Sequence, residues 1–315
     1  MSNNLAFVFP GQGSQSVGML ANLAGVSPVI RATFDDASQV LGYDLWQLCS
    51  QGPVDELNST ERTQPAMLAA GFATWRLWEE RKGPIPAVVT GHSLGEFTAL
   101  VAAGAVDFKS CVDLVRFRGR AMQEAVPVGT GSMAALLGLD DAAVEAACAQ
   151  AAQGSVVEAV NFNAPGQVVI AGEKAAVLRA IEAAKASGAK RAIELPVSVP
   201  SHSSLMKSAG ARLAERLAAT EIRAPRLRYL SAVDAKEHSD PDDIRALLVR
   251  QVSSPVRWTA TVTALSGGGV HNIVECGPGG VLAGLVKRIE KGRDTKILSL
   301  DEPQSFETAL AAVAS

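Results

Sequence analysis

A serine between two glycines carries the clearest chemical signal in this sequence. An apolar run ends at Gly91-His92-Ser93-Leu94-Gly95, and a helix-forming stretch follows directly. A Gly-x-Ser-x-Gly pattern between a strand and a helix is typical of a nucleophile elbow, a sharp turn that exposes the serine hydroxyl. Glycines are needed there because only a residue without Cβ lets strand and helix approach so closely. The alternative is a glycine-rich helix cap without chemistry, but the flanking strand (87–90) and helix (94–103) favour a nucleophilic Ser93.

A second glycine-rich loop follows the apolar strand expected at 5–9. Its sequence is Pro10-Gly11-Gln12-Gly13-Ser14-Gln15-Ser16-Val17-Gly18. A dinucleotide-binding Gly-x-Gly-x-x-Gly would need glycine at position 16, where the chain has Ser16. A plain turn is one alternative. The other is an oxyanion hole, because elbow enzymes take one N–H from the residue after the nucleophile and another from a separate loop. We therefore expect the backbone N–H groups of Gln12 and Leu94 to be the donors.

A serine nucleophile needs a base, and the chain has four histidines. His92 adjoins the nucleophile, so its side chain should leave the elbow in another direction. His238 lies in a polar run, 236–240, that we expect to be an exposed loop, and His271 is expected at the core or edge of a strand. His202 lies between a strand end and a helix and is flanked by small serines that leave room around the ring. It is the expected base for Ser93.

No acidic residue is singled out to orient the ring of His202. We therefore expect its second nitrogen to meet a neutral oxygen, either from Gln251 or from a backbone carbonyl.

Four side chains of a helix behind the elbow are also candidates. Asp107 caps this helix, expected over 108–124, which carries Arg116, Arg118, Arg120 and Met122. Arg118 and Met122 are four residues apart and share a face, whereas the other two arginines lie well round the helix. From spacing alone, all three arginines could be solvated surface residues.

Composition limits the class of protein. The 315 residues are 48% hydrophobic, which is enough for one large domain or two smaller ones. A net charge of -3 argues against nucleic-acid binding. The four cysteines have no paired spacing, so neither a disulfide framework nor a zinc site is expected, and a reducing cytoplasm fits best. No apolar run reaches the ~18 residues of a membrane span.

The order of the expected elements changes in the middle of the chain. Strands are expected at 133–138, 156–161, 167–171 and 191–197, with helices at 140–153 and 173–187. This β-α-β-β-α-β order is the signature of a ferredoxin-like unit. We expect an α/β fold with an inserted ferredoxin-like small domain at 127–200 and a large domain made of 1–126 and 201–315. His202 lies where the chain returns from the small domain to the large domain, so we expect a cleft between the two domains there.

Several independent motifs together resemble one family. They are Phe9-Pro10-Gly11-Gln12-Gly13-Ser14-Gln15, Gly91-His92-Ser93-Leu94-Gly95-Glu96, Arg118-Gly119-Arg120-Ala121-Met122-Gln123, Asn161-Phe162-Asn163-Ala164-Pro165-Gly166-Gln167, Pro200-Ser201-His202-Ser203, Gln251 before Pro255-Val256-Arg257-Trp258, and Glu275-Cys276-Gly277-Pro278-Gly279. The chain resembles the malonyl-CoA:acyl carrier protein transacylases of bacterial fatty-acid synthesis, nearly from end to end.

This resemblance implies that the large domain is hydrolase-like, with a parallel sheet and a nucleophile elbow. It also implies an acyltransferase that moves malonyl from malonyl-CoA to acyl carrier protein in a ping-pong reaction. Malonyl-CoA would be a substrate, and no cofactor or metal is expected. The implied roles are nucleophile for Ser93, base for His202, partner of the malonyl carboxylate for Arg118, oxyanion donors for the N–H groups of Gln12 and Leu94, and a place beside His202 for Gln251. We also expect Gln64, Met122 and Asn161 to bind substrate.

The basic residues Lys287, Arg288 and Lys291 are expected to dock the acidic carrier protein, and the chain to act as a monomer. Two other classes remain open. A serine esterase would share the elbow, but usually has an acidic residue for its histidine and an apolar acyl pocket. A docking module without activity would keep the fold and the basic stretch and would not need Ser93.

Overall fold

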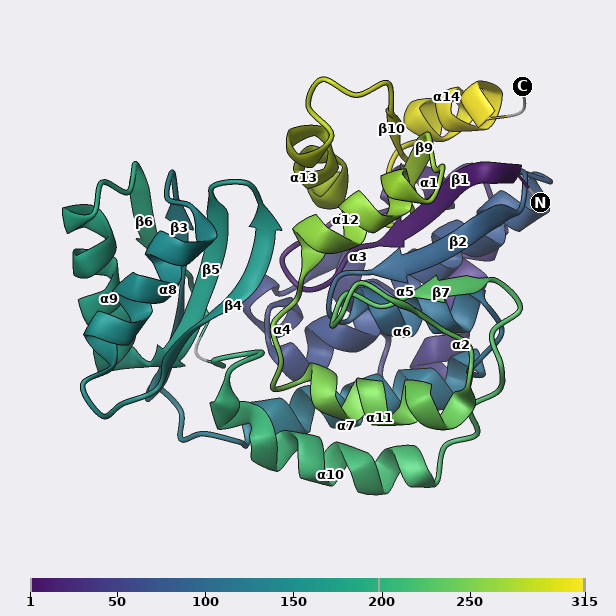
Figure 1. Cartoon of the computed structure of the whole chain (residues 1–315). Helices are drawn as coiled ribbons and strands as arrows, with labels where there is room; N and C mark the ends of the chain where they lie inside the picture. Colours follow the sequence, from purple (N-terminus) through teal and green to yellow (C-terminus); the bar gives the residue numbers. More distant parts are fainter. Residues whose placement is uncertain (1, 198, 314–315) are drawn as a thin grey trace.

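The computed structural model describes residues 2–197 and 199–313. Its larger sheet has the strand order β10-β9-β1-β2-β7-β8 (Figure 1). These strands are β1 (Ser2–Phe9), β2 (Pro86–Gly91), β7 (Arg228–Leu230), β8 (Glu237–His238), β9 (Asn272–Glu275) and β10 (Lys296–Ser299). All pairs are parallel except β7 with β8. The carboxyl ends of β1, β2 and β9 therefore meet at one edge, and the loops that follow them can build a common site.

Alternate residues of β1 face two different cores, because successive side chains of a strand point to opposite faces. Leu5, Phe7 and Phe9 pack in one core with Trp75 and Trp78. The helices that contribute to this core are α1 (Ala21–Ala24), α2 (Pro28–Leu41), α3 (Leu45–Gln51), α4 (Val54–Leu57), α5 (Thr60–Glu80), α6 (Gly95–Ala102), α7 (Phe108–Gln123), α10 (Lys207–Ala218), α11 (Pro241–Gln251) and α14 (Pro303–Val313).

The other face of β1 presents Ala6 and Val8 to a smaller core with Trp258. That core is closed by α12 (Trp258–Gly267) and α13 (Val281–Ile289), which Figure 1 shows on the opposite side of the sheet from α6, α7 and α11. The large sheet is thus covered by helices on both faces, which explains why residues 5–9 of β1 and 87–89 of β2 are apolar without alternation.

The second sheet is antiparallel, with the order β4-β5-β3-β6. Its strands are β3 (Gly131–Leu137), β4 (Val157–Ala164), β5 (Gln167–Glu173) and β6 (Arg191–Glu194), and α8 (Asp141–Ala152) and α9 (Lys174–Ala186) pack on one face. The elements follow the β-α-β-β-α-β order predicted from the sequence. Two backbone hydrogen bonds of Val256, to Val160 O and from Phe162 N, join β4 to the larger part of the chain.

Some expected boundaries were wrong. β6 ends at Glu194, and the helix after His202 begins with a short 3-10 turn, η1 (Ser204–Met206). His238 is not in an exposed loop: it lies in β8, and its Nε2 is 3.2 Å from Asp234 Oδ1.

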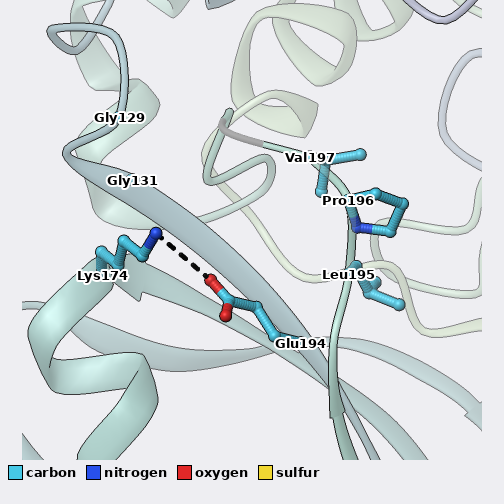
Figure 2. A pocket seen from close by; sticks show the side chains of 7 residues that line it. All are labelled: Gly129, Gly131, Lys174, Glu194, Leu195, Pro196 and Val197. Carbon is cyan, nitrogen blue, oxygen red and sulfur yellow. Dashed lines mark ion pairs between the residues drawn. The ribbon is translucent and has the colours of Figure 1, made fainter.

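A pocket of about 480 Å³ lies beside β6 and the start of α9 (Figure 2). Lys174 Nζ and Glu194 Oε1 are 3.9 Å apart across it. The segment 195–197 lines this pocket and also the larger cavity described below. Among the helices that the structure describes, none is both long enough and apolar enough to cross a membrane.

Candidate active site

Ser93 occupies a strained turn between β2 and α6. Its φ is 53°, a left-handed value that side-chain-bearing residues rarely adopt and that is typical of functional sites. Close backbone contacts leave no room for a side chain at either glycine. A Cβ on Gly91 would lie 1.9 Å from Gly95 C, and one on Gly95 would lie 1.9 Å from Phe9 O. The elbow predicted from Gly-x-Ser-x-Gly is therefore present, with α6 starting directly behind the serine.

His202 is the histidine that reaches the serine. Its Nε2 is 2.7 Å from Ser93 Oγ, and its Nδ1 is 2.9 Å from the backbone carbonyl oxygen of Gln251. With Nδ1–H donating to that carbonyl, Nε2 is left to accept the serine proton. The structure thus brings together the predicted pair, and of the two oxygens left open it selects the backbone carbonyl of Gln251.

The environment of His202 keeps its imidazole neutral. The side chain is 4% exposed, and its φ of 67° is again left-handed. Burial lowers the pKa of His202 to about 3, and the nearby positive charge of Arg118 acts in the same direction. At neutral pH the ring is therefore a free base that can take a proton.

Arg118 differs from its two neighbours on α7. Its side chain is 1% exposed, and Nη1 donates to Gln64 Oε1 at 2.9 Å. Nη2 donates to Gln251 Oε1 at 2.9 Å and to Ser93 Oγ at 3.2 Å. Burial lowers the pKa of Arg118 to about 10, so it stays charged at neutral pH. Arg116 and Arg120 lie nearer the surface in ion pairs, a distinction that helical spacing did not reveal.

Two backbone N–H groups near Ser93 are unused. Within the described residues, neither Gln12 N nor Leu94 N has a hydrogen-bond acceptor. The loop that carries Gln12 is pressed against the elbow, because a Cβ on Gly11 would lie 2.4 Å from His92 O. Gln12 and Leu94 both line the cavity that contains Ser93, as the residues of an oxyanion hole must.

A cavity of about 580 Å³ leads to these groups. Gln64, Met122 and Asn161, the other expected substrate contacts, all line it. Gln64 Nε2 is 3.6 Å from Met122 Sδ, and Asn161 Oδ1 is buried without a partner in the described part of the chain. Leu195 and Val197 from the smaller sheet's side form part of the wall, so the cavity lies between the two sheets. No cluster of three or more metal-binding side chains is found within 2–197 and 199–313.

Sequence reasoning missed the carboxylate of this site. Glu96 in α6 is 1% exposed, and its Oε1 accepts a hydrogen bond of 2.8 Å from Gln251 Nε2. Its Oε2 accepts one from the hydroxyl of Tyr229, a buried residue of β7. The signals for Glu96 were its place in the motif Gly91-His92-Ser93-Leu94-Gly95-Glu96 and its charge in a largely apolar helix. His92, in contrast, leaves the elbow as predicted, with Nε2 2.8 Å from Asn163 Oδ1.

The predicted docking cations lie away from this cavity. Lys287 and Arg288 are exposed in the last turn of α13, and Lys291 is exposed just after it. Arg288 Nη1 donates to Gln167 Oε1 of β5. Lys287 and Lys291 have no ion pair in the described part of the chain.

An elbow serine paired with a neutral histidine between two sheets defines an acyl-transferring enzyme, and the chain belongs to the acyl transferase domain family, which it matches over residues 6–300. The malonyl CoA-acyl carrier protein transacylase of Escherichia coli K12 is 55% identical over 306 residues, covering 97% of this chain and 98% of the relative. The enzyme of the same name from Bacillus subtilis is 42% identical over 309 residues, covering 98% and 96%.

Solved structures of malonyltransferases are also similar to this chain. An acyl carrier protein S-malonyltransferase from Vibrio cholerae superposes with a TM-score of 0.93 at 54% identity, covering 97% of this chain and 99% of that one. A malonyl-transacylase solved with its type II polyketide acyl carrier protein superposes with a TM-score of 0.96 at 52% identity, covering 98% and 99%. At such identity the relatives support function as well as fold.

Proposed function

We propose that this chain transfers the malonyl group of malonyl-CoA to the phosphopantetheine thiol of acyl carrier protein, in fatty-acid biosynthesis. One observation carries the proposal beyond general acyl transfer: a buried guanidinium, that of Arg118, lies 3.2 Å from the hydroxyl of Ser93. A charged group at that place is suited to an acyl donor whose far end is a carboxylate. An apolar acyl chain would desolvate this charged group without pairing with it, so the site disfavours the apolar acyl chains that an esterase accepts.

In the first half-reaction, Ser93 Oγ attacks the thioester carbonyl of malonyl-CoA while its proton passes to His202 Nε2. The oxyanion that forms is held by the N–H groups of Gln12 and Leu94; a single donor of this kind contributes about 3 kcal/mol. When the intermediate collapses, the C–S bond breaks and His202 returns the proton to the sulfur of CoA. Malonyl-serine remains.

The second half-reaction runs the same steps with another thiol. His202 takes the proton of the phosphopantetheine thiol of the carrier protein, and the thiolate attacks the malonyl ester. The C–O bond to Ser93 breaks, and the proton passes from His202 to Oγ. The enzyme returns to its starting state, which makes the reaction ping-pong and requires no cofactor.

Arg118 selects the acyl group in this scheme. A guanidinium presents a planar fork of N–H donors to a carboxylate, so it binds malonyl in one orientation with the thioester carbonyl at Ser93. Gln64 holds the other side of the guanidinium, and Met122 and Asn161 line the space for the acyl group. Acetyl offers no carboxylate and would leave this charge unpaired.

The two sheets correspond to two domains in this proposal. Residues 1–126 and 201–315 form a hydrolase-like catalytic domain, supported by the elbow at the end of a central parallel strand. Residues 127–200 form a ferredoxin-like domain, supported by its antiparallel β4-β5-β3-β6 order. The substrate cavity lies between them.

Lys287, Arg288 and Lys291 dock the carrier protein in this proposal. All three are exposed on and just after α13. Their positive charge on a chain of net charge -3 suits an acidic partner. A relative has been solved in complex with its acyl carrier protein, which supports a carrier protein as the partner.

Intact-protein mass spectrometry tests the function directly. Incubation with malonyl-CoA should add one malonyl group to the parent protein, and subsequent addition of holo acyl carrier protein should remove it to the carrier. Ser93→Ala should acquire no malonyl group. If the serine ester is lost to water faster than to the carrier protein, the chain is an esterase; if no ester forms, it is a docking module.

A further inference from the structure

The carboxylate of Glu96 takes no part in the steps above, although it lies three residues after the nucleophile. It is 1% exposed and accepts hydrogen bonds from the amide of Gln251 and the hydroxyl of Tyr229. Burial is the larger influence and raises the pKa of Glu96 above its usual range, although these two donors oppose the shift. A carboxyl group that only receives hydrogen bonds is stabilised in its ionised form. Both of these partners donate to Glu96, so the hydrogen bonds around it fit the carboxylate form, with a negative charge inside the catalytic domain.

The amide of Gln251 connects this charge to the active site. Its Nε2 donates to Glu96 Oε1 at 2.8 Å and to the backbone oxygen of Ser93 at 2.9 Å. Its Oε1 accepts from Arg118 Nη2 at 2.9 Å. With two acceptors on one side and a donor on the other, only one orientation of the amide satisfies every partner. Glu96 supplies one of those two acceptors.

Glu96 also balances the charge of Arg118. Within the described residues no carboxylate lies within ion-pair distance of this guanidinium, although burial opposes its charge. The negative charge of Glu96 acts against burial and raises the pKa of Arg118. Because the Gln251 amide stands between them, Glu96 compensates the charge without occupying the side of the guanidinium that faces Ser93.

We propose that Glu96 is a positioning residue for malonyl selectivity: through the Gln251 amide it holds the Arg118 guanidinium beside Ser93 Oγ and leaves it open to the substrate carboxylate. The inference rests on the function proposed above for Arg118. It assigns to this site the acidic residue that sequence reasoning did not find beside His202.

The variant Glu96→Gln keeps the shape of the side chain and removes its charge. Two facing amides can pair in either orientation, so Gln251 can turn its NH2 group toward Arg118 and displace it. We expect kcat/KM for malonyl-CoA to fall at least about tenfold, toward the roughly hundredfold cost of a misplaced group, with a smaller loss for acetyl-CoA. The matched control is Tyr229→Phe, which removes the other hydrogen bond of the same carboxylate; it should lower the Tm and leave the malonyl-to-acetyl ratio at the parent value.

A double variant, Glu96→Gln with Gln251→Glu, keeps the buried charge and moves it next to Arg118. An ion pair should then occupy the guanidinium, so KM for malonyl-CoA should rise while KM for acetyl-CoA does not. If Glu96→Gln does not fold, this double variant provides the test of the role of Glu96. A parent-like malonyl-to-acetyl ratio in Glu96→Gln, or an unchanged KM for malonyl-CoA in the double variant, overturns the inference.

The parent and Arg118→Ala are measured together with the Glu96 variants. These two measurements distinguish a failure of the proposed function from a failure of the role inferred for Glu96. If the parent prefers malonyl-CoA and Arg118→Ala does not, the proposed function stands and the Glu96 variants test the inference alone. If the parent shows no preference for malonyl-CoA, the proposed function and the inference both fail.

Discussion

The ring of His202 donates its Nδ1–H to the backbone carbonyl of Gln251, 2.9 Å away. In a serine–histidine–aspartate arrangement a carboxylate holds that position, orients the ring and stabilises its protonated form. Here the acceptor is neutral and belongs to the last residue of α11, whose side chain holds Arg118 and Glu96. The histidine is therefore oriented by the same residue that organises the acyl-binding arginine.

The low pKa of His202 has a consequence for activity. A histidine with the ordinary pKa of about 6.5 would lose its basic form below that pH. Because burial and Arg118 lower the pKa of His202 to about 3, kcat/KM should stay level between pH 8 and 5. Stopped-flow measurement of Ser93 acylation after a pH jump checks this. An acidic limb near pH 6.5 that depends on His202 would contradict it.

The lowered pKa of His202 also makes the stability of the folded chain depend on pH. Below about pH 6.5 the unfolded chain protonates His202, whereas the folded chain does so only near pH 3. The folded state therefore loses stability as the pH falls through this window, by up to about 1.4 kcal/mol per pH unit from this residue. Chemical denaturation of the parent and of His202→Asn at pH 7 and pH 5 tests the prediction. The variant should lose less stability over that interval, and equal losses would argue against it.

Replacement of Arg118 by alanine should change which acyl donor is used. Loss of one partner of a buried charge pair costs roughly 3–5 kcal/mol, equivalent to a few hundredfold or more in malonyl transfer. Acetyl transfer should suffer much less, and Arg118→Lys should recover part of the malonyl activity. Arg116→Ala is the control, since that arginine makes a partly exposed ion pair with Asp113. Steady-state transfer from both donors is the measurement; equal losses would remove Arg118 from the substrate site.

The glycine behind the nucleophile should not tolerate a methyl group. In Gly95→Ala the Cβ would lie 1.9 Å from Phe9 O, so α6 must move away from β1. We expect a loss of about 1–3 kcal/mol of unfolding free energy, typical of overpacking, together with lower activity because Ser93 and Leu94 move too. Gly284→Ala in α13 is the matched control, since its Cβ would meet nothing within 4 Å. Urea denaturation should show the control to be as stable as the parent or more so.

Charge reversal of Lys287, Arg288 and Lys291 should slow association with the carrier protein. Attraction between opposite charges raises association rates most at low ionic strength. The difference in association rate between parent and variant should therefore increase as salt is removed. Lys236→Glu, an exposed site on the β7–β8 turn, controls for net charge. Association rates across a salt series decide the case. If the triple variant matches the parent at low salt, these residues are ordinary solvated side chains.

The sequence by itself determined the features that depend on residues close together in the chain. Gly-x-Ser-x-Gly between an apolar strand and a helix forms the elbow through local backbone geometry, and the β-α-β-β-α-β alternation follows from local periodicity. His202 was found by elimination, because a serine nucleophile needs a base and the other three histidines lay in poorer settings. The sequence left two oxygens open as the partner of its second nitrogen.

Only the tertiary structure decided which polar groups share one buried volume. Arg118 differs from Arg116 and Arg120 because packing buries it against Gln64 and Gln251, partners 54 and 133 residues away in the chain. Glu96 became part of the site through Gln251, 155 residues away. Side-chain periodicity places a residue on one face of its own helix, but the partners of a buried charge come from other elements, and no local pattern encodes which of these will meet it.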